Sequence, residues 1–417
     1  MECNEWLIFK EIYSDESEKN MIELVATCMF GLEKALGEEI DALGCKRIET
    51  IDGRVTFAGE WADVARANIN LRCAERVLIK IGAFHAASFV ELFDGTAALP
   101  WEDYIGVDDA FPVKGHAIKS QLFSVPDCQK IIKKAIVSRM SQTHGVEWFS
   151  EEGTKYQVEF FIFKDVATLM IDTSGVTLHK RGYRPEAGIA PLRETLAAAL
   201  VMNAHLREDV LLWDPFCGSG TIAIEAAMMM AKIAPGLNRR FLAEDYDFLP
   251  MDIWSRAREE ARDNEQRNVA FEAYASDIDE SCLAIAAENA SRAGVSDKIK
   301  IFRQDARQIA KLDRRATILC NPPYGERLLD TEQAEKLYRE IGRNFNTLYP
   351  WQIYILSSCE SFERFYGRRA DKIKKYYNGT IPCYLYQFYK PQDTKKPFGE
   401  YHAPHKGNYG KKPFVKK

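Results

Sequence analysis

The sequence predicts an α/β fold, with a doubly wound, mostly parallel sheet in the C-terminal half and smaller α+β units before it. Two patterns support this prediction. From Asp209 onward, short apolar strands alternate regularly with helical segments, which is typical of parallel βαβ units. Before Thr177, strands and helices are interleaved less regularly. The length of 417 residues gives room for two or three domains at about 150 residues each.

The N-terminal part is expected to fold as two α+β units. An apolar run at residues 24–28, a 3.6-residue periodicity over 31–43 and a strand at 54–57 begin the first unit. A helix at 61–71 and a strand at 76–84 follow. The second unit is expected to contain helix, strand, helix and two strands, at residues 88–99, 111–118, 127–143, 156–163 and 166–172.

The main domain boundary is expected at residues 181–185 (RGYRP), which break the pattern before a helix over 191–204. The strands of the large sheet are then expected at 210–213, 271–276, 299–303, 317–320 and 352–356, with a closing hairpin at 372–377 and 384–389. The chain thus divides into residues 1–75, 76–178 and 179–390, followed by a tail over 391–417.

The charge is distributed unevenly along the chain. The formal net charge of -5 argues against a dedicated nucleic-acid binder, but residues 360–417 carry +9 and the rest of the chain -14. The tail from Lys390 has eight lysines and two acids, and we expect it to be disordered unless a polyanion orders it. A second basic run contains Asp127 as its one acid and six basic residues: Lys114, Lys119, Lys130, Lys133, Lys134 and Arg139. Both stretches are candidate RNA-binding surfaces, and a solvated helix face is the alternative for the second.

Compartment and metal content are constrained by the cysteines and histidines. The ten cysteines form no Cys-x-x-Cys pair, which favours reduced thiols and a cytoplasmic location. The first 20 residues lack the apolar segment of a signal peptide, and nowhere do 18 apolar residues run together, so we expect no export and no membrane span. The seven histidines show no metal-ligand spacing, so no metal is expected.

A glycine-rich turn, DPFCGSGT, follows an apolar strand at Asp214 and opens a helix over residues 222–230. Gly218 and Gly220 allow a sharp turn against which a ligand can lie, and the helix N-terminus offers free N–H groups. Asp277 ends the next strand and is placed to accept hydrogen bonds from ribose hydroxyls, whereas Asp279 is more suited to capping a helix. Asp305 ends the following strand and could accept from an adenine amine, with a surface cap as the alternative. The turn by itself is also consistent with a purely structural role.

The most specific motif is Asn321-Pro322-Pro323-Tyr324, directly after an apolar strand. An exocyclic base amine is a poor nucleophile because its lone pair is delocalised into the ring. The Asn321 side-chain oxygen and the Pro322 carbonyl can orient its N–H bonds, tandem prolines fix the backbone, and Tyr324 offers a face for an extruded base. A plain loop is the alternative. Cys320 beside the motif is expected to be buried and inert.

These motifs together resemble the class I S-adenosylmethionine-dependent methyltransferases that act on exocyclic amines of bases. More narrowly, the chain resembles the bacterial rRNA guanine-N2 methyltransferases with a THUMP domain, typified by the N-terminal half of the large-subunit methyltransferase L. The matching stretches are residues 26–44, 178–200, 214–227, 233–240 and 321–328. They are specific together and weak singly.

The resemblance implies a Rossmann-like domain with a seven-stranded, mostly parallel sheet, preceded by a ferredoxin-like unit and a THUMP RNA-binding domain. It also implies roles for individual residues. Asn321, Pro322, Pro323 and Tyr324 would hold the base. The cofactor, S-adenosylmethionine, would contact Thr195, Asp214, Phe216, Gly218, Gly220, Asp277, Asp305 and Asn321. Apart from the resemblance, the basic residues Arg181 and Arg184 near His179 are expected to meet RNA phosphates or solvent.

The function expected from all of this is methyl transfer to the N2 amine of a flipped guanine in structured RNA, expected to be 23S rRNA. An adenine-N6 methyltransferase acting on DNA or RNA is the nearest alternative, and a non-catalytic RNA-binding assembly factor is an alternative of another class. A dehydrogenase is disfavoured because 57 positions separate Gly220 from Asp277, where about 20 are usual.

Overall fold

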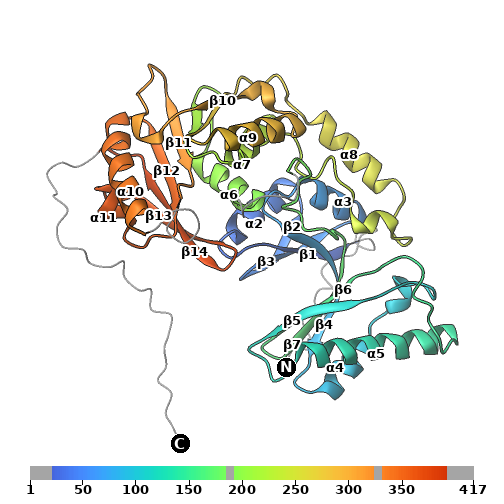
Figure 1. Cartoon of the computed structure of the whole chain (residues 1–417). Helices are drawn as coiled ribbons and strands as arrows, with labels where there is room; N and C mark the ends of the chain where they lie inside the picture. The colour runs from blue at the N-terminus through green and yellow to red at the C-terminus, as the bar shows by residue number, and fades with distance from the viewer. Residues whose placement is uncertain (1–20, 185–191, 324–330, 392–417) are drawn as a thin grey trace, which may run out of the picture.

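The computed structural model describes residues 21–184, 192–323 and 331–391, which build two seven-stranded sheets. One sheet belongs to the N-terminal half, and the other forms the centre of the C-terminal domain (Figure 1). The predicted α/β class, with two smaller α+β units ahead of a doubly wound domain, is confirmed.

The N-terminal sheet has the strand order β2-β3-β1-β4-β7-β6-β5. Its helices contribute to the same core cluster as Val77 and Ile79 of β4, so they cover one face of the sheet. The strands are β1 (Ile22–Thr27), β2 (Lys46–Ile51), β3 (Arg54–Gly59), β4 (Arg76–His85), β5 (Val113–Ile118), β6 (Val158–Phe163) and β7 (Val166–Asp172). The helices are α2 (Glu33–Ala42), α3 (Trp61–Asn70), α4 (Phe89–Ala97), η2 (Trp101–Asp103) and α5 (Val125–His144).

Strand β4 belongs to both N-terminal units. It pairs antiparallel with β1 through Arg76–Ile79 and with β7 along most of its length, with a bulge between Lys80 and Gly82. The division expected between residues 75 and 76 therefore falls at the start of β4, the central strand of one continuous sheet, and no linker separates the two units there.

Strand β2 was not predicted. Its sequence KRIETI lacks a buried face, and five of its six residues are exposed, because β2 is an edge strand. Hydrophobic alternation therefore gave no signal there, and only pairing with β3 forms the strand.

The C-terminal sheet has the order β10-β9-β8-β11-β12-β14-β13. Its first five strands are parallel, and β14 is antiparallel to both neighbours, so the predicted closing hairpin is confirmed. The strands are β8 (Leu211–Asp214), β9 (Ala273–Asp277), β10 (Ile299–Arg303), β11 (Ala316–Cys320), β12 (Gln352–Ser357), β13 (Lys372–Asn378) and β14 (Ile381–Phe388).

Helices cover both faces of this sheet. Leu212 and Leu319 join the core cluster that contains α6 and α7, whereas Trp213 and Ile318 join a second cluster with α10 and α11. The helices of the domain are α6 (Glu194–Ala204), α7 (Thr221–Met230), α8 (Ile253–Asp263), α9 (Glu280–Arg292), α10 (Thr331–Phe345) and α11 (Phe362–Tyr366), with short turns η3 (Leu242–Asp245), η4 (Ser296–Lys298), η5 (Ala306–Gln308) and η6 (Asn346–Leu348).

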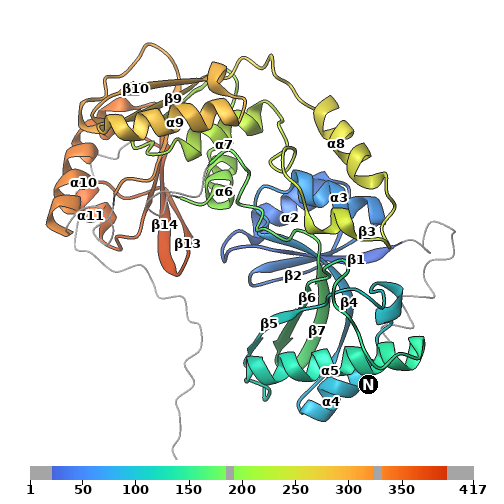
Figure 2. The same cartoon turned by 45° about the vertical axis from the view of Figure 1, so that its right-hand side comes forward.

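The segment between α7 and β9 docks the C-terminal domain onto the N-terminal units. Helix α8 lies beside α3 in both views (Figure 2), and the Gly236 N–H donates to Ile69 O at 2.8 Å. Tyr246 stacks on Tyr156 with ring centroids 4.4 Å apart. The insertion that lengthens the spacing between Gly220 and Asp277 is thus a strap that joins the domains.

Two absences concern the described residues. None of their helices combines the length and apolar character needed to cross a membrane. None of their His, Cys, Asp and Glu side chains form a group of three or more that could hold a metal ion.

Candidate active site

The predicted site residues gather at the carboxyl ends of four neighbouring parallel strands. Asp214 ends β8 and Asp277 ends β9, while Asp305 follows β10 and Asn321 follows β11. These strands are adjacent in the order β10-β9-β8-β11. Ligands of open α/β sheets bind at this edge, so the structure brings the acidic residues and the Asn-Pro-Pro motif to one location.

The glycine turn between β8 and α7 is held by Asp277. Gly218 and Gly220 have φ of +49° and +81°, a region that favours glycine. The Gly218 N–H donates to Asp277 Oδ2 at 3.0 Å, and the Asp279 N–H donates to Asp277 Oδ1 at 3.2 Å. A Cβ built at Gly218 would meet no atom within 4 Å, so open space lies against the turn.

Asp214 is buried at the end of β8, beneath the turn. Its Oδ1 accepts from the Phe216 N–H at 3.2 Å. Burial, together with the nearby Asp277 carboxylate, raises the pKa of Asp214 to about 8. Asp214 therefore shapes the turn from below.

Asp305 is engaged within its own turn. It caps η5 by accepting from the Arg307 N–H at 2.9 Å, and both of its oxygens also accept from the Arg307 guanidinium. These bonds lower the pKa of Asp305. This geometry is the surface cap that was considered as the alternative role for Asp305. The oxygens of its carboxylate can still accept further hydrogen bonds at the carboxyl end of β10.

Ile278 is a residue of this edge that sequence reasoning missed. It directly follows Asp277 and its side chain is 59% exposed, next to the turn that Asp277 holds. An apolar residue after a strand-ending acid is a local signal that could have identified it.

The Asn-Pro-Pro motif leaves a fully buried strand, β11. The Asn321 Oδ1 atom is buried and has no hydrogen-bond partner among the described residues. The Pro323 carbonyl accepts from Tyr338 OH at 3.3 Å, and Tyr338 OH also lies 3.2 Å from Ser357 Oγ. Tyr338 of α10 and Ser357 of β12 thereby hold the backbone after Asn321. The fourth residue of the motif, Tyr324, lies outside the described residues.

Cys320 does not contribute a nucleophile. It is completely buried, and burial raises the pKa of its thiol far above the ordinary value. The expectation of an inert thiol agrees with this environment.

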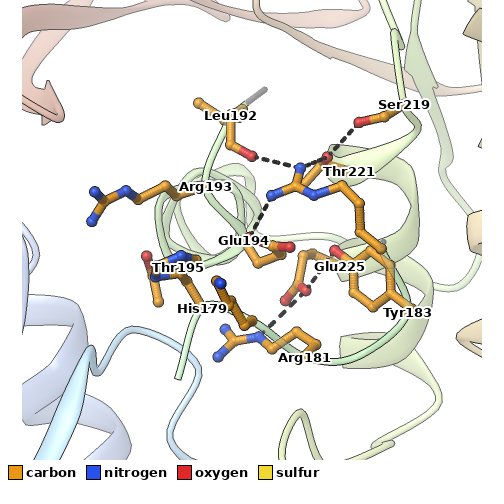
Figure 3. Close-up of polar contacts among 12 residues, drawn as sticks. His179, Arg181, Tyr183, Leu192, Arg193, Glu194, Thr195, Ser219, Thr221 and Glu225 are labelled. Atoms are coloured by element: carbon orange, nitrogen blue, oxygen red, sulfur yellow. Dashed lines mark hydrogen bonds and ion pairs between the residues drawn. The ribbon is translucent and has the colours of Figure 1, made fainter. Parts of the chain in front are cut away.

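Arg184 lies against the start of α7, where its guanidinium has internal partners. Its guanidinium pairs with Glu194 at 2.9 Å and donates to Leu192 O and Thr221 Oγ1, each at 3.2 Å. Figure 3 shows the contacts that run from Leu192 and Glu194 to Thr221 and Ser219. Three internal partners engage its guanidinium, but the side chain keeps 17% exposure, so RNA contact by Arg184 stays a prediction.

The prediction that Arg181 contacts RNA is wrong, because its side chain is buried. Its side chain is 2% exposed and lies 3.6 Å from Glu225, which accepts from Tyr183 OH at 3.1 Å (Figure 3). The guanidinium also donates to Leu178 O at 2.6 Å. A buried cation compensated in this way cannot reach a phosphate.

Thr195 is completely buried, and its hydroxyl donates to Glu75 Oε1 at 2.8 Å. Glu75 precedes β4 and also accepts from His179 Nδ1 at 2.9 Å and Arg193 at 3.4 Å. The prediction that Thr195 contacts the cofactor is therefore wrong. Its hydroxyl instead forms a hydrogen bond between the domains. Sequence could not reveal its partner, which lies 120 positions away.

The basic run divides in the structure. Arg139 forms a bidentate pair with Glu102, and Lys133 pairs with Glu151 at 2.6 Å. Acids distant in sequence thus neutralise these two residues. Lys114, Lys119, Lys130 and Lys134 are exposed.

The arrangement fits a nucleoside-containing cofactor and a planar base. The open glycine turn, the acids ending β9 and β10 and the exposed Ile278 supply a surface for a ribose and an adenine. The orphaned Asn321 Oδ1 supplies an acceptor to a group that the protein itself does not provide.

Three family domains match the chain in order. The RlmL ferredoxin-like domain matches residues 23–78, the THUMP domain matches 86–172, and the domain described as RMKL-like, methyltransferase domain, matches 181–387.

Relatives match over most of the chain. YpsC of Bacillus subtilis (strain 168), named as a candidate RNA methyltransferase, is 42% identical over 379 residues, which cover 89% of this chain and 98% of that protein. The ribosomal RNA large subunit methyltransferase K/L of Psychromonas ingrahamii is 34% identical over 364 residues, covering 85% and 48%. The chain thus spans about half the length of the K/L relatives that it matches.

Solved structures give the same result. A possible methylase from Clostridium difficile 630 is 43% identical with a TM-score of 0.86, covering 89% of this chain and 99% of that one. A structure from Listeria monocytogenes, described as a predicted N6-adenine-specific DNA methylase, is 44% identical with a TM-score of 0.84, covering 89% and 97%. SMU.472, a candidate methyltransferase complexed with SAH, is 38% identical with a TM-score of 0.84, covering 89% and 98%.

Proposed function

The chain belongs to the RMKL-like methyltransferase family, and from this premise we propose that it methylates the exocyclic N2 amine of a guanine in 23S rRNA. The observation that carries the proposal is the buried Asn321 Oδ1, which has no partner among the described residues. A buried acceptor without a donor is costly, and a substrate N–H is the donor that would remove this cost. Modification of rRNA would take place in the cytoplasm, where the nine described cysteines would remain free thiols.

The methyl donor of the family is S-adenosylmethionine, whose sulfonium supplies an activated methyl group when it is bound. The residues of this chain that would hold it are the glycine turn, Phe216 and the acids Asp277 and Asp305. Asp277 already fixes the turn through Gly218, and the oxygens of a carboxylate can accept further bonds from ribose hydroxyls. Asp214 supports the turn from below.

The Asn-Pro-Pro segment would orient the base. The Asn321 side-chain oxygen and the Pro322 carbonyl would accept the two N–H bonds of the amine, so that its lone pair turns away from the ring plane. Tyr338 and Ser357 hold the next carbonyl, which keeps the segment rigid. The catalysis that this geometry offers is therefore mainly positioning of the amine.

Adenine-N6 methylation is the second candidate, because the same pair of acceptors suits either amine. The Listeria monocytogenes protein, at 44% identity, is named for this activity on DNA. The THUMP domain at residues 86–172 favours RNA over DNA as the substrate for this chain.

The test is methyl transfer to 23S rRNA that lacks modifications, followed by nucleoside analysis. We expect labelled N2-methylguanosine from the full chain and at least a hundredfold less from Asn321→Ala. Asn346→Ala is the matched control, because its Oδ1 is also buried without a partner but lies before β12, away from the carboxyl ends. N6-methyladenosine as the sole product would overturn the guanine assignment, and unchanged product from Asn321→Ala would overturn the role of Asn321.

A further inference from the structure

The N-terminal sheet has one face that the described helices leave open. Val25, Leu78, Met170 and Phe161 form a separate small cluster on this face, and all four lie on strands. On the edge strand β5, Lys114, His116 and Ile118 alternate with less exposed residues and point to the same side. The open face therefore carries its own side chains, distinct from the core under α4 and α5.

Aromatic rings line this face along β6. In the parallel pairing of β5 and β6, His116 lies opposite Phe161 and Ile118 opposite Phe163. The rings of Phe161 and Phe163 are half-buried, and their centroids lie 5.9 Å apart at an interplanar angle of 17°. At about 3.3 Å per residue, the stripe from Lys114 to Lys119 is roughly 16 Å long.

Cations surround the two rings. The Arg54 guanidinium lies over the Phe161 ring, 3.5 Å from its centroid, so Phe161 is stacked with a cation and Phe163 is the ring left for a base. The ammonium groups of Lys119 and Lys164 lie 5.9 and 5.2 Å from the centroid of Phe163. Half-buried rings flanked by cations are the combination on which unstacked bases bind, because stacking holds the base and the cations attract its phosphates.

A cavity of about 370 Å³ lies at one end of the same face. Arg76, Lys114, Lys155 and Arg240 line it together with three acids. Two acids are engaged, because Asp172 pairs with Arg76 and Asp245 pairs with Arg240, and the third, Glu159, lies 4.0 Å from Arg76.

Lys114 and Lys155 are the two cations of this cavity that have no described ionic partner. Neither forms an ion pair or side-chain hydrogen bond within residues 21–184, 192–323 and 331–391. Arg240 comes from the strap of the C-terminal domain, so the cavity joins the open face to the domain that holds the candidate active site.

We propose that this open face, from Phe163 through Phe161 to the cavity beside Lys114 and Lys155, binds a single-stranded segment of the RNA substrate. This inference rests on the proposed function and adds the surface and the form of RNA to it. A duplex keeps its bases stacked and cannot use the rings, so the phenylalanines favour a single strand. The exposed lysines on α5, Lys130 and Lys134, then lie outside the proposed RNA-binding face.

The test measures binding of the full chain, without cofactor, to a fluorescent twelve-nucleotide oligouridylate and to an RNA hairpin of similar length. Phe163→Leu keeps an apolar side chain but removes the stacking face, and we expect about fivefold weaker binding or more. Lys114→Ser combined with Lys119→Asn should reduce the slope of log affinity against log salt by about 1.4, the value for two lost contacts to a single strand. Asn is chosen because Lys119 has φ of +53°.

Lys130→Ser combined with Lys134→Ser is the matched control and should leave both measurements unchanged. The inference is overturned if this control loses affinity while the open-face variants bind like the wild type, or if the hairpin binds as tightly as the single strand. Absence of any RNA binding by the wild type would instead contradict the proposed function, so the two failures are distinguishable.

Discussion

Tyr338 is the residue whose hydroxyl holds the backbone of the Asn-Pro-Pro motif. Its hydroxyl contacts both Pro323 O and Ser357 Oγ, and its side chain is 1% exposed. A small shift of a positioned acceptor changes the alignment of the amine with the methyl donor. Under the proposed function, Tyr338 is therefore a positioning residue, since its described contacts would act on the base only through the motif.

We expect Tyr338→Phe to lower kcat about tenfold, with little change in KM for the methyl donor, and to lower the free energy of unfolding by about 1 kcal/mol. Tyr354→Phe is the control, because the Tyr354 hydroxyl donates to Gln352 at the amino end of β12, the strand that also carries Ser357. Steady-state kinetics and urea unfolding check both variants. A stability loss with unchanged kcat would show that Tyr338 only packs.

The raised pKa of Asp214 predicts that the free energy of unfolding depends on pH. Its pKa of about 8 in the folded chain lies above the ordinary value near 3.9. Between these values the folded state binds a proton that the unfolded state has released, so this group destabilises the fold progressively as pH rises from about 4 to 8. We expect Asp214→Asn to remove this effect.

The measurement is the difference in Tm between Asp214→Asn and the wild type at pH 5, 7 and 8.5. As pH rises, the Tm of Asp214→Asn should increase relative to the Tm of the wild type. A constant difference across the range would contradict the raised pKa.

The location of a site residue could be predicted where the residue directly follows a recognisable apolar strand. Asp277 and Asn321 follow apolar strands, and neighbouring parallel strands bring their carboxyl ends together. The assignments of Arg181 and Thr195 were wrong because both side chains are buried against partners, Glu225 and Glu75, that are not apparent from sequence spacing. A basic residue beside a boundary indicates charge but not burial.

At the scale of elements, strands with a buried face were predicted within a few residues and the exposed edge strand β2 was missed. β7 and β10 have the predicted bounds because their apolar residues face a core. Docking of the segment between α7 and β9 onto α3 could not be predicted, since it depends on complementarity between surfaces that are distant in sequence.

Gly236 tests this docking. A Cβ at this position would lie 2.7 Å from Asn68 O and 2.8 Å from Ile69 Cα, both backbone atoms of α3. We expect Gly236→Ala to lower the free energy of unfolding by about 1–3 kcal/mol, as overpacking does.

Gly106→Ala is the control, because its Cβ would meet a side chain and no backbone atom, the nearest contact being the Asp109 carboxylate at 2.9 Å. Urea unfolding should show a clearly smaller change for it. Equal effects of the two substitutions would mean that the strap adapts to the added methyl group.

At the scale of the whole molecule, Glu75 connects the N-terminal units to the first helix of the C-terminal domain. It is largely buried and accepts from His179, Thr195 and Arg193. These partners lower the pKa of Glu75 despite the opposing effect of burial. Removal of the carboxylate would leave the buried Thr195 hydroxyl and the His179 ring without this acceptor at the domain junction.

We expect Glu75→Ala to lower the free energy of unfolding by about 3 kcal/mol or more. Glu38→Ala is the control: its pair with Lys34 is exposed and 3.6 Å long, so a change within about 0.5 kcal/mol is expected. Denaturant unfolding measures both, and similar effects would remove Glu75 from the junction.

A strand shared by two units has a further consequence for substrate choice. β4 leaves no flexible linker between the ferredoxin-like and THUMP parts, and the strap fixes the C-terminal domain against both. If the open face binds RNA as proposed, the fold sets the distance between that face and the candidate active site. The protein would then select its target nucleotide by the distance from the bound segment, and an RNA with the right sequence at the wrong distance would not be modified.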